Sequence, residues 1–552
     1  MTHPHGGLAL VKALQQQRVE RVFCVPGESY LAALDALHEA EIETIVARQE
    51  GGAAMMAEAD GKLSGRPGVA FVTRGPGATN AASGVHVAYQ DSTPMVLFVG
   101  QVASDQRDRE AFQEVDLVAM FSPLAKWVAN IDRVDRLPEY ISHAFHVAQS
   151  GRPGPVVLGL PEDMLSSDCD AASVPAATLP SGLAAQHDVQ AVMRAIGSAE
   201  RPLVIVGGGG WSARAAEALG HFARLCELPV GASFRCQDYL DNRHPNYVGD
   251  VGIGINPALA QRVRDADLIL ALGARLGEMT TSGYTLLTPP LPRQRLIHVH
   301  ADPNELGRVY RPELAVVACA GAMIEQLAAA AEAPSVERGA WVRAARDDYA
   351  SWQQPEPTPG ALHMENVIAR LNEVLGDDAI LTNGAGNYSA WLHRYYRYRG
   401  FRTQLAPTSG SMGYGLPAAI AAKLRHPERD AICLAGDGCF QMVSQELGTA
   451  CQYGAAVVIL VINNGMYGTI RMHQQKRYPR RPSATDLVNP DFAALARAYG
   501  AFGETVDHDD AFADALSRAL EHTRRSASPA LLELRQDRQA LSPRLTLEQL
   551  NP

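Results

Sequence analysis

Short apolar runs alternate along the chain with longer stretches rich in alanine and leucine. The runs end at glycine or at polar clusters, and examples are GVAFVT, PMVLFVG, GPVVLGL, PLVIVGG, LILALG, AICLAG and VVILVINN. Runs of this kind are typical of strands buried on both faces, and the stretches between them are typical of covering helices. The pattern therefore predicts an α/β protein of doubly wound, mainly parallel sheets.

Two stretches break this rhythm. Residues 169–185 are rich in Asp, Ala, Ser and Pro, and residues 350–361 (SWQQPEPTPGAL) are rich in Pro and Gln. Both read as linkers. Because 552 residues exceed what one core accommodates, we expect three α/β domains, at 1–168, 186–345 and 360–545.

Composition narrows the class of protein. The 47% hydrophobic and 20% charged residues are those of a soluble globular chain, and the net charge of −11 is spread without a basic block, which argues against nucleic acid as a partner. No apolar run approaches the ~20 residues that span a bilayer, and MTHPHGG lacks signal-peptide features, so we expect a cytoplasmic protein. The eight cysteines form no CxxC pair, which favours free thiols over zinc or disulfides.

The richest chemistry lies between residues 431 and 468. One expected strand ends in Gly436-Asp437-Gly438 and leads into a helical stretch, and the next ends in Asn463-Asn464-Gly465. Consecutive parallel strands end at the same sheet edge, so Asp437 and Asn464 are expected to face each other. Their oxygens suit Mg²⁺, the helix start suits a diphosphate, and the two glycines allow close backbone approach. Two unrelated turns are the alternative interpretation.

This GDG…NN segment resembles the cofactor motif of the thiamine-diphosphate enzymes. The resemblance implies pyrimidine-binding, central and diphosphate-binding domains in that order. It also implies that Mg²⁺ is held by Asp437, Asn464 and the backbone carbonyl of Met466.

A second stretch, RQEGGAAMMAEADG, follows an expected strand near the N-terminus. Taken alone, Glu50 is more often a surface helix cap. The stretch is similar to the family's R-H-E-x-G-A-A, with Gln49 in place of His. That similarity implies that Glu50 hydrogen-bonds the cofactor's pyrimidine N1′ and promotes deprotonation of C2. It further implies a homodimer or homotetramer with the active site at the subunit interface.

Further runs resemble acetolactate synthase: GPGATN (75–80), AFQEVD (111–116) and SMGYGLPAAIAAK (411–423). Unaided, Met412 reads as a core residue. The resemblance implies that Met412 bends the cofactor and that backbone atoms of Gly410 and Met412 hold its pyrimidine ring. The other residues that it places near cofactor or substrate are Gly27, Gln113, Asn80, Asn387 and Tyr388.

Three features depart from the acetolactate synthase pattern. His473 stands where the biosynthetic enzymes have Trp. The runs VGIGIN (251–256) and GEMTTSG (277–283) replace those that contact FAD, which makes FAD binding doubtful; the Gly207–Gly210 cluster reads equally as a nucleotide loop or a domain-opening loop. Glu28 stands where that family has Gly and where pyruvate decarboxylases have a catalytic Asp, which favours a decarboxylase. Thr73 stands where benzoylformate decarboxylase has a catalytic His, which argues against one.

These observations predict a thiamine-diphosphate-dependent carboligase that decarboxylates pyruvate or a related 2-oxoacid. Glu50, Gln113 and Glu28 are the candidate catalytic residues. A 2-oxoacid decarboxylase or an aldehyde or 2-hydroxyacyl-CoA lyase on the same scaffold is the alternative. A non-catalytic binding or regulatory protein is the alternative of another class, against which the set Glu50, Asp437 and Asn464 argues.

Overall fold

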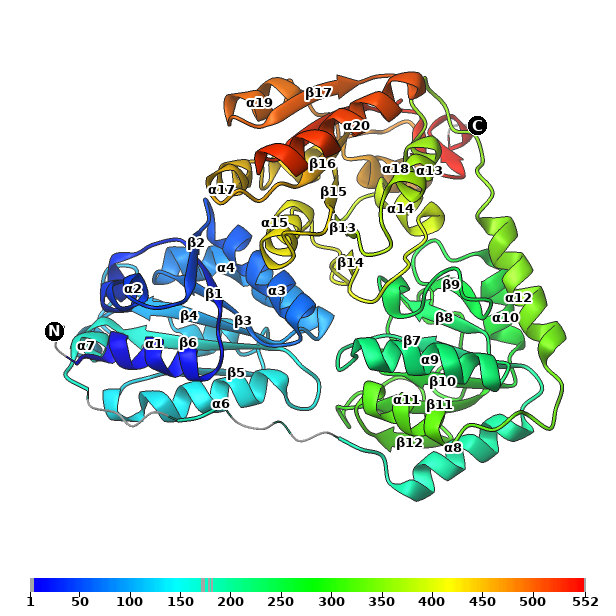
Figure 1. Ribbon diagram of the computed structural model, residues 1–552, viewed down its shortest axis with the longest axis horizontal. Coiled ribbons are helices and arrows are strands. Elements are labelled where there is room, and N and C mark those ends of the chain that lie inside the picture. Colours follow the sequence, from blue (N-terminus) through cyan, green and yellow to red (C-terminus); the bar gives the residue numbers. More distant parts are fainter. Residues whose placement is uncertain (1–3, 170–173, 177–178, 180–181, 551–552) are drawn as a thin grey trace.

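Three six-stranded sheets, with helices packed around them, make up the computed structural model, which describes residues 4–169, 174–176, 179 and 182–550. Every strand pair within the three sheets is parallel. The expected α/β class is thereby confirmed. In Figure 1 the N-terminal unit is blue to cyan, the middle unit is mainly green, and the C-terminal unit, yellow to red, lies above both. The expected linker at 169–185 falls partly outside the described residues.

The N-terminal sheet has the strand order β2-β1-β3-β4-β6-β5. Its strands are β1 (Arg21–Cys24), β2 (Glu43–Val46), β3 (Gly68–Val72), β4 (Met95–Gln101), β5 (Trp127–Asn130) and β6 (Pro155–Pro161). Its helices are α1 (Gly6–Gln16), α2 (Leu31–His38), α3 (Glu50–Ser64), α4 (Gly75–Asp91), α5 (Leu117–Phe121), α6 (Leu137–Gln149) and α7 (Glu162–Ser166), with 3-10 turns η1 (Glu28–Tyr30), η2 (Ser104–Gln106) and η3 (Val134–Arg136).

The middle sheet has the order β12-β11-β10-β7-β8-β9. Its strands are β7 (Pro202–Val206), β8 (Val230–Ser233), β9 (Tyr247–Val251), β10 (Leu268–Leu272), β11 (Arg295–His300) and β12 (Leu314–Val317). Its helices are α8 (Gln186–Ser198), α9 (Ala213–Leu225), α10 (Pro257–Asp265), α11 (Ala320–Ala329) and α12 (Gly339–Trp352), with η4 (Gln237–Tyr239). The central strands are fully buried, as continuous apolar runs require.

The C-terminal sheet has the order β14-β13-β15-β16-β18-β17, and a small antiparallel pair follows it. The strands are β13 (Ile380–Asn383), β14 (Gln404–Leu405), β15 (Ala431–Gly436), β16 (Val458–Asn463), β17 (Phe502–Val506), β18 (Ala530–Arg535), β19 (Ala540–Ser542) and β20 (Leu545–Thr546). The helices are α13 (Met364–Val374), α14 (Ser389–Tyr395), α15 (Gly415–Arg425), α16 (Asp437–Gln441), α17 (Glu446–Gln452), α18 (Gly468–Arg477), α19 (Phe492–Ala498) and α20 (Asp509–Ser526), with η5 (Glu548–Leu550).

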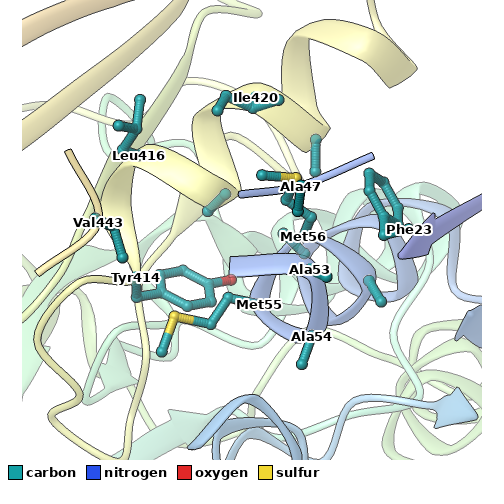
Figure 2. Packing of buried hydrophobic residues seen from close by; sticks show 14 of the residues in the cluster. Phe23, Ala47, Ala53, Ala54, Met55, Met56, Tyr414, Leu416, Ile420 and Val443 are labelled. Carbon is teal, nitrogen blue, oxygen red and sulfur yellow. The ribbon is translucent and has the colours of Figure 1, made fainter. Parts of the chain in front are cut away.

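The N- and C-terminal units share one apolar core, in which α3 packs against both α4 and α15. Helix α3 is buried on nearly all sides, and the three Gly and four Ala among its 15 residues allow other elements to approach it closely. A Cβ at Gly84 of α4 would lie 2.4 Å from that of Ala54, so only glycine allows this close approach. Figure 2 shows Met55 of α3 beside the ring of Tyr414 and Met56 between Ile420 and Phe23, within this shared core.

The eight cysteines are free, and six of them are buried, as expected. Among the described residues, no group of three or more His, Cys, Asp or Glu side chains is arranged to hold a metal. No helix in the described ranges is long and apolar enough to cross a membrane.

Candidate active site

Asp437 lies where two neighbouring strands of the C-terminal sheet end. Strands β15 and β16 pair in parallel with Gly436 opposite Ile462, so Asp437 comes beside the 463–465 turn. The side chain is buried, with Oδ1 accepting from the N–H of Gly438 at 2.8 Å and Oδ2 from the N–H of Gly465 at 2.8 Å. The two halves of the GDG…NN motif therefore meet at one sheet edge.

Asn489 completes the surroundings of Asp437. Its Nδ2 donates to Oδ2 of Asp437 at 2.7 Å and to Oδ1 of Asn463 at 2.8 Å. Sequence reasoning missed this residue, because it follows Asn464 by 25 positions in no recognised motif. All the hydrogen-bond donors to Asp437 among the described residues are uncharged, and burial raises its pKa above the ordinary value. A buried carboxylate without a counter-charge is a group that a bound cation would stabilise.

Asn464 and Met466 lie on the same turn. Oδ1 of Asn464 accepts the N–H of Met466 at 3.2 Å, and the carbonyl of Met466 accepts the N–H of Gly468 at 2.9 Å. Each oxygen keeps a second lone pair. A carboxylate, an amide oxygen and a carbonyl oxygen are the hard donors that Mg²⁺ prefers, so these residues fit that metal.

The two glycines of the motif are close to aromatic rings. A Cβ at Gly436 would lie 2.9 Å from Cδ1 of Tyr388, and one at Gly438 would lie 2.5 Å from Cε1 of Tyr467. Larger residues therefore do not fit without moving a ring. The helical stretch expected after Gly438 is interrupted: α16 ends at Gln441 and α17 begins at Glu446.

Glu446, the first residue after this interruption, connects the C-terminal unit to the N-terminal unit. Both carboxylate oxygens of Glu446 lie 3.2 Å from the backbone N–H of Arg48, just before α3. A Cβ at Gly52 would lie 2.5 Å from Oε1 of Glu446. The break lets a buried carboxylate reach the start of α3, which a continuous helix would not.

Asn387 and Tyr388 lie between β13 and α14. Oδ1 of Asn387 accepts the hydroxyl of Thr469 at 2.9 Å, and that hydroxyl oxygen accepts the Asn387 N–H at 3.0 Å. The Tyr388 hydroxyl accepts the N–H of Gly384 at 3.0 Å, and the ring is buried. Asn387 therefore contacts α18 at the border of the site. Tyr388 packs from within the core against Gly436 of the motif.

Gly410 and Met412 lie on the segment between β14 and α15. Gly410 is exposed and has a left-handed φ of 68°, which glycine adopts without strain. Met412 is half-buried against the core of the C-terminal unit. The N–H of Gly413 donates to Sγ of Cys439 at 3.1 Å.

Glu50 begins α3, with Gln49 as the N-cap residue. The side chain of Gln49 accepts the N–H groups of Gly51 and Gly52, at 2.6 and 3.2 Å. Asn80 of α4 donates its Nδ2 to Oε2 of Glu50 at 2.9 Å. Sequence reasoning placed both residues near the cofactor, and the structure brings them into contact.

Gly27, Glu28 and Gln113 lie at the same edge of the N-terminal sheet. A Cβ at Gly27 would lie 2.6 Å from Cβ of Thr73. The carbonyl of Gln113, whose φ is 64°, accepts the N–H of Gly75 at 2.8 Å, which places Gln113 beside the start of α4.

Glu28 belongs to an ion-pair cluster that sequence reasoning missed. Arg74, whose side chain is 8% exposed, donates to Oε1 of Glu28 at 3.2 Å and to Oε2 of Glu162 at 2.6 Å. The three residues lie at the starts of η1, α4 and α7, far apart in the sequence, so only the folded chain brings them together.

A cavity of about 880 Å³ lies between the three units. Gly208–Gly210, Gly277–Thr280 and Gly386–Asn387 are among its lining residues. The glycine cluster and the GEMTTSG run singled out above therefore face a common space. Its volume is within the range of small-molecule sites.

Three family models match successive parts of the chain. Residues 4–120 match the thiamine pyrophosphate enzyme N-terminal TPP binding domain, 189–327 the central domain, and 384–534 the C-terminal TPP binding domain. Thiamine pyrophosphate is another name for thiamine diphosphate.

Relatives match over nearly the whole chain. The acetolactate synthase large subunit of Parasynechococcus marenigrum (strain WH8102) is 33% identical over 551 residues, 96% of this chain and 87% of that protein. The acetolactate synthase of Mycobacterium leprae (strain TN) is 31% identical, covering 93% and 84%, and the large subunit of Lactococcus lactis subsp. lactis (strain IL1403) is 30% identical, covering 96% and 92%. The chain therefore belongs to the thiamine pyrophosphate enzymes and, within them, to the acetolactate synthase family.

Proposed function

We propose that this chain is a thiamine-diphosphate- and Mg²⁺-dependent carboligase that decarboxylates pyruvate, or a related 2-oxoacid, and joins the remaining fragment to a second carbonyl. The observation that carries the proposal is the buried, uncompensated carboxylate of Asp437 beside the oxygens of Asn464 and Met466. The similarity to acetolactate synthases over nearly the whole chain supports the reaction type.

Each part of the C-terminal site has a role in this proposal. Asp437, Asn464 and the carbonyl of Met466 would hold Mg²⁺, and Gly436 and Gly438 leave room for the diphosphate. The cofactor would supply a nucleophilic carbon and an electron sink for the charge that decarboxylation leaves. Gly410 and Met412 would position its pyrimidine ring.

Glu50 would hold and move the proton at the pyrimidine. The amide of Asn80, 2.9 Å from Oε2, orients the carboxylate for this task. A positioned carboxyl group typically contributes about 10²- to 10⁴-fold to a proton-transfer step. Gln113 and Glu28 stay candidates for contact with substrate.

The similarity to acetolactate synthases over nearly the whole chain favours carboligation over the decarboxylase alternative. Glu28 does not decide between the two reactions: its side chain is 66% exposed and accepts from the guanidinium of Arg74 at 3.2 Å.

We further propose that the active site forms between two subunits. Within the described chain, no hydrogen bond or ion pair joins the Glu50–Asn80 pair to the Asp437 cluster. Large apolar side chains are exposed in both units: Leu31 and Phe112 in the N-terminal unit, and Met442, Ile470 and Val488 in the C-terminal unit. Exposed apolar side chains are what a subunit interface would cover.

Mixing two inactive variants tests the shared site. A dimer of Glu50→Gln and Asp437→Asn subunits would contain one site with both native residues. Random exchange should then restore roughly a quarter of wild-type activity. No recovery, with mixed dimers shown to form, would contradict a shared site.

The cavity between the units is the candidate site for FAD, if this chain binds it. We propose that the reaction itself does not require FAD, because neither decarboxylation nor ligation transfers electrons. A flavin absorbance spectrum of the purified protein shows whether the cavity holds one. Undiminished ligation after flavin removal is the expected result, and strict dependence on flavin would contradict it.

The cofactor assignment is tested by removing thiamine diphosphate and Mg²⁺ and then adding them back. Protein dialysed against a chelator should regain turnover only with thiamine diphosphate and Mg²⁺ together. Asp437→Asn should fail to regain it, whereas Asp430→Asn, at the opposite end of β15 and paired with Arg524, should behave as wild type. Unchanged cofactor affinity in Asp437→Asn would remove the metal site from the proposal.

A further inference from the structure

Two carboxylates of the N-terminal unit hold the two ends of segment 408–414 in the C-terminal unit. Oδ1 of Asp91 accepts the backbone N–H of Thr408 at 2.8 Å and its hydroxyl at 2.6 Å. Oε2 of Glu58 accepts the hydroxyl of Tyr414 at 2.6 Å. In Figure 2 the Tyr414 hydroxyl points toward α3, from which Glu58 comes.

One lysine joins the two anchors. Nζ of Lys62 lies 3.1 Å from Oε1 of Glu58 and donates to Oδ2 of Asp91. The hydroxyl of Thr93 donates to Oε1 of Glu58 at 2.6 Å. All four carboxylate oxygens are thus occupied, and the ends of the segment are connected through a continuous polar cluster.

The two carboxylates of the cluster are deeply buried: the side chains of Glu58 and Asp91 are 0% and 1% exposed, whereas that of Lys62 is 22% exposed. Burial raises the pKa of Glu58. Burial alone would lower the pKa of Lys62, but Asp91 and Glu58 raise it well above its ordinary value. Buried ion pairs contribute little net stability compared with apolar side chains of similar size. The benefit of this cluster therefore lies in the geometry that it imposes.

The residues between the anchors need such a constraint. Gly410 is exposed, and apart from residues 409–411 no atom of the described chain lies within 4 Å of a Cβ built on it. The backbone at Gly410 and Met412 is the part that the proposed function assigns to the pyrimidine ring. Flexible ends would let this backbone drift from the cofactor, and small displacements lower rates strongly.

We propose that Glu58, Lys62 and Asp91 form one positioning cluster that sets segment 408–414 in the conformation that receives the cofactor. The inference rests on the proposed function, because it takes Gly410 and Met412 as the residues that hold the pyrimidine. In the proposed function none of the three cluster residues is assigned to the pyrimidine; Lys62 and Asp91 border the cavity between the units.

The positioning role can be tested by removing the hydroxyl groups that donate to Glu58 and Asp91, which leaves the buried charges in place. Tyr414→Phe is expected to weaken thiamine-diphosphate binding roughly tenfold, since it leaves Oε2 of Glu58 without its donor. Thr408→Val removes one donor to Asp91 at the other end. If the cluster acts as a unit, the loss in the double variant differs from the product of the single losses. Calorimetric titration with thiamine diphosphate at fixed Mg²⁺ measures all four proteins.

Tyr453→Phe is the matched control. The Tyr453 hydroxyl accepts the N–H of Val46 at 2.8 Å, so it crosses between the same two units without touching segment 408–414. This variant should bind the cofactor as wild type does. At saturating cofactor, the near-ultraviolet circular-dichroism signal of bound thiamine diphosphate should change in Tyr414→Phe only.

The outcomes separate the two proposals. Wild-type protein that binds no thiamine diphosphate contradicts the proposed function and the inference with it. Wild-type binding together with unchanged binding and dichroism in Tyr414→Phe overturns the positioning cluster alone. Equal weakening in Tyr414→Phe and Tyr453→Phe also overturns it, because the effect would then belong to the contact between units in general.

Discussion

Replacing Glu50 by Gln should separate proton transfer from folding. The amide keeps the shape of the side chain and keeps an oxygen that accepts from Asn80, which lies 2.9 Å from the native carboxylate. Loss of the charge at the start of α3 costs about 0.3–1 kcal/mol of stability. Loss of the carboxyl proton relay should lower turnover about 10²- to 10⁴-fold.

Gln49→Ala is the matched control and should show the opposite signature. Its side-chain oxygen caps α3 by accepting two N–H groups, at 2.6 and 3.2 Å. Removing a helix N-cap costs about 0.5–2 kcal/mol, while the Glu50 carboxylate remains. The variant should therefore unfold at a lower temperature but keep most of its turnover.

Both variants are assayed for turnover of pyruvate at saturating thiamine diphosphate and Mg²⁺, and for unfolding temperature. Near-full turnover by Glu50→Gln, with the protein folded and cofactor-loaded, would refute the proton-relay role. An equal loss of turnover in Gln49→Ala would show that the effect comes from the helix start and not from the carboxylate.

Two further substitutions test the packing at the cofactor motif and the burial of one carboxyl group. Gly438→Ala should weaken binding of the Mg²⁺–thiamine diphosphate pair, because its Cβ would lie 2.5 Å from the Tyr467 ring and overpacking costs about 1–3 kcal/mol; calorimetry that finds native affinity contradicts this. Asp238→Asn should flatten the pH dependence of unfolding. Burial raises the pKa of Asp238 from 3.8 to about 6, so the folded state binds this proton more tightly, and stability falls as pH rises between these values. The variant keeps the acceptor for Thr403 and Gln404, and should gain about 3 kcal/mol over wild type at neutral pH. An unfolding free energy that changes with pH equally in wild type and Asp238→Asn would contradict this prediction.

The buried strands were the predictable part of the fold. Each apolar run named at the outset coincides with most or all of a strand, because central strands of a parallel sheet are apolar on both faces. The edge strands β5 and β17 carry no such run, since part of each remains accessible. Their position depends on neighbouring strands more than on their own residues.

The candidate site was predictable where chemistry follows a strand end. Asp437 accepts the N–H of Gly465, next to Asn464, because β15 and β16 are adjacent, which the order of the runs already indicated. Asn489 and Arg74 were not predictable, because their partners depend on how loops fold back. The pairing of Glu58 with Tyr414, 356 residues apart, depends on how two units pack and leaves no local pattern in the sequence.

The reaction product tests the central claim most directly. Purified protein is incubated with pyruvate, thiamine diphosphate and Mg²⁺, and the products are identified by NMR. The proposed carboligase predicts acetolactate together with released CO₂, and no product when either cofactor is omitted. Acetaldehyde as the sole product would contradict carboligation and assign the chain to the decarboxylases on this scaffold.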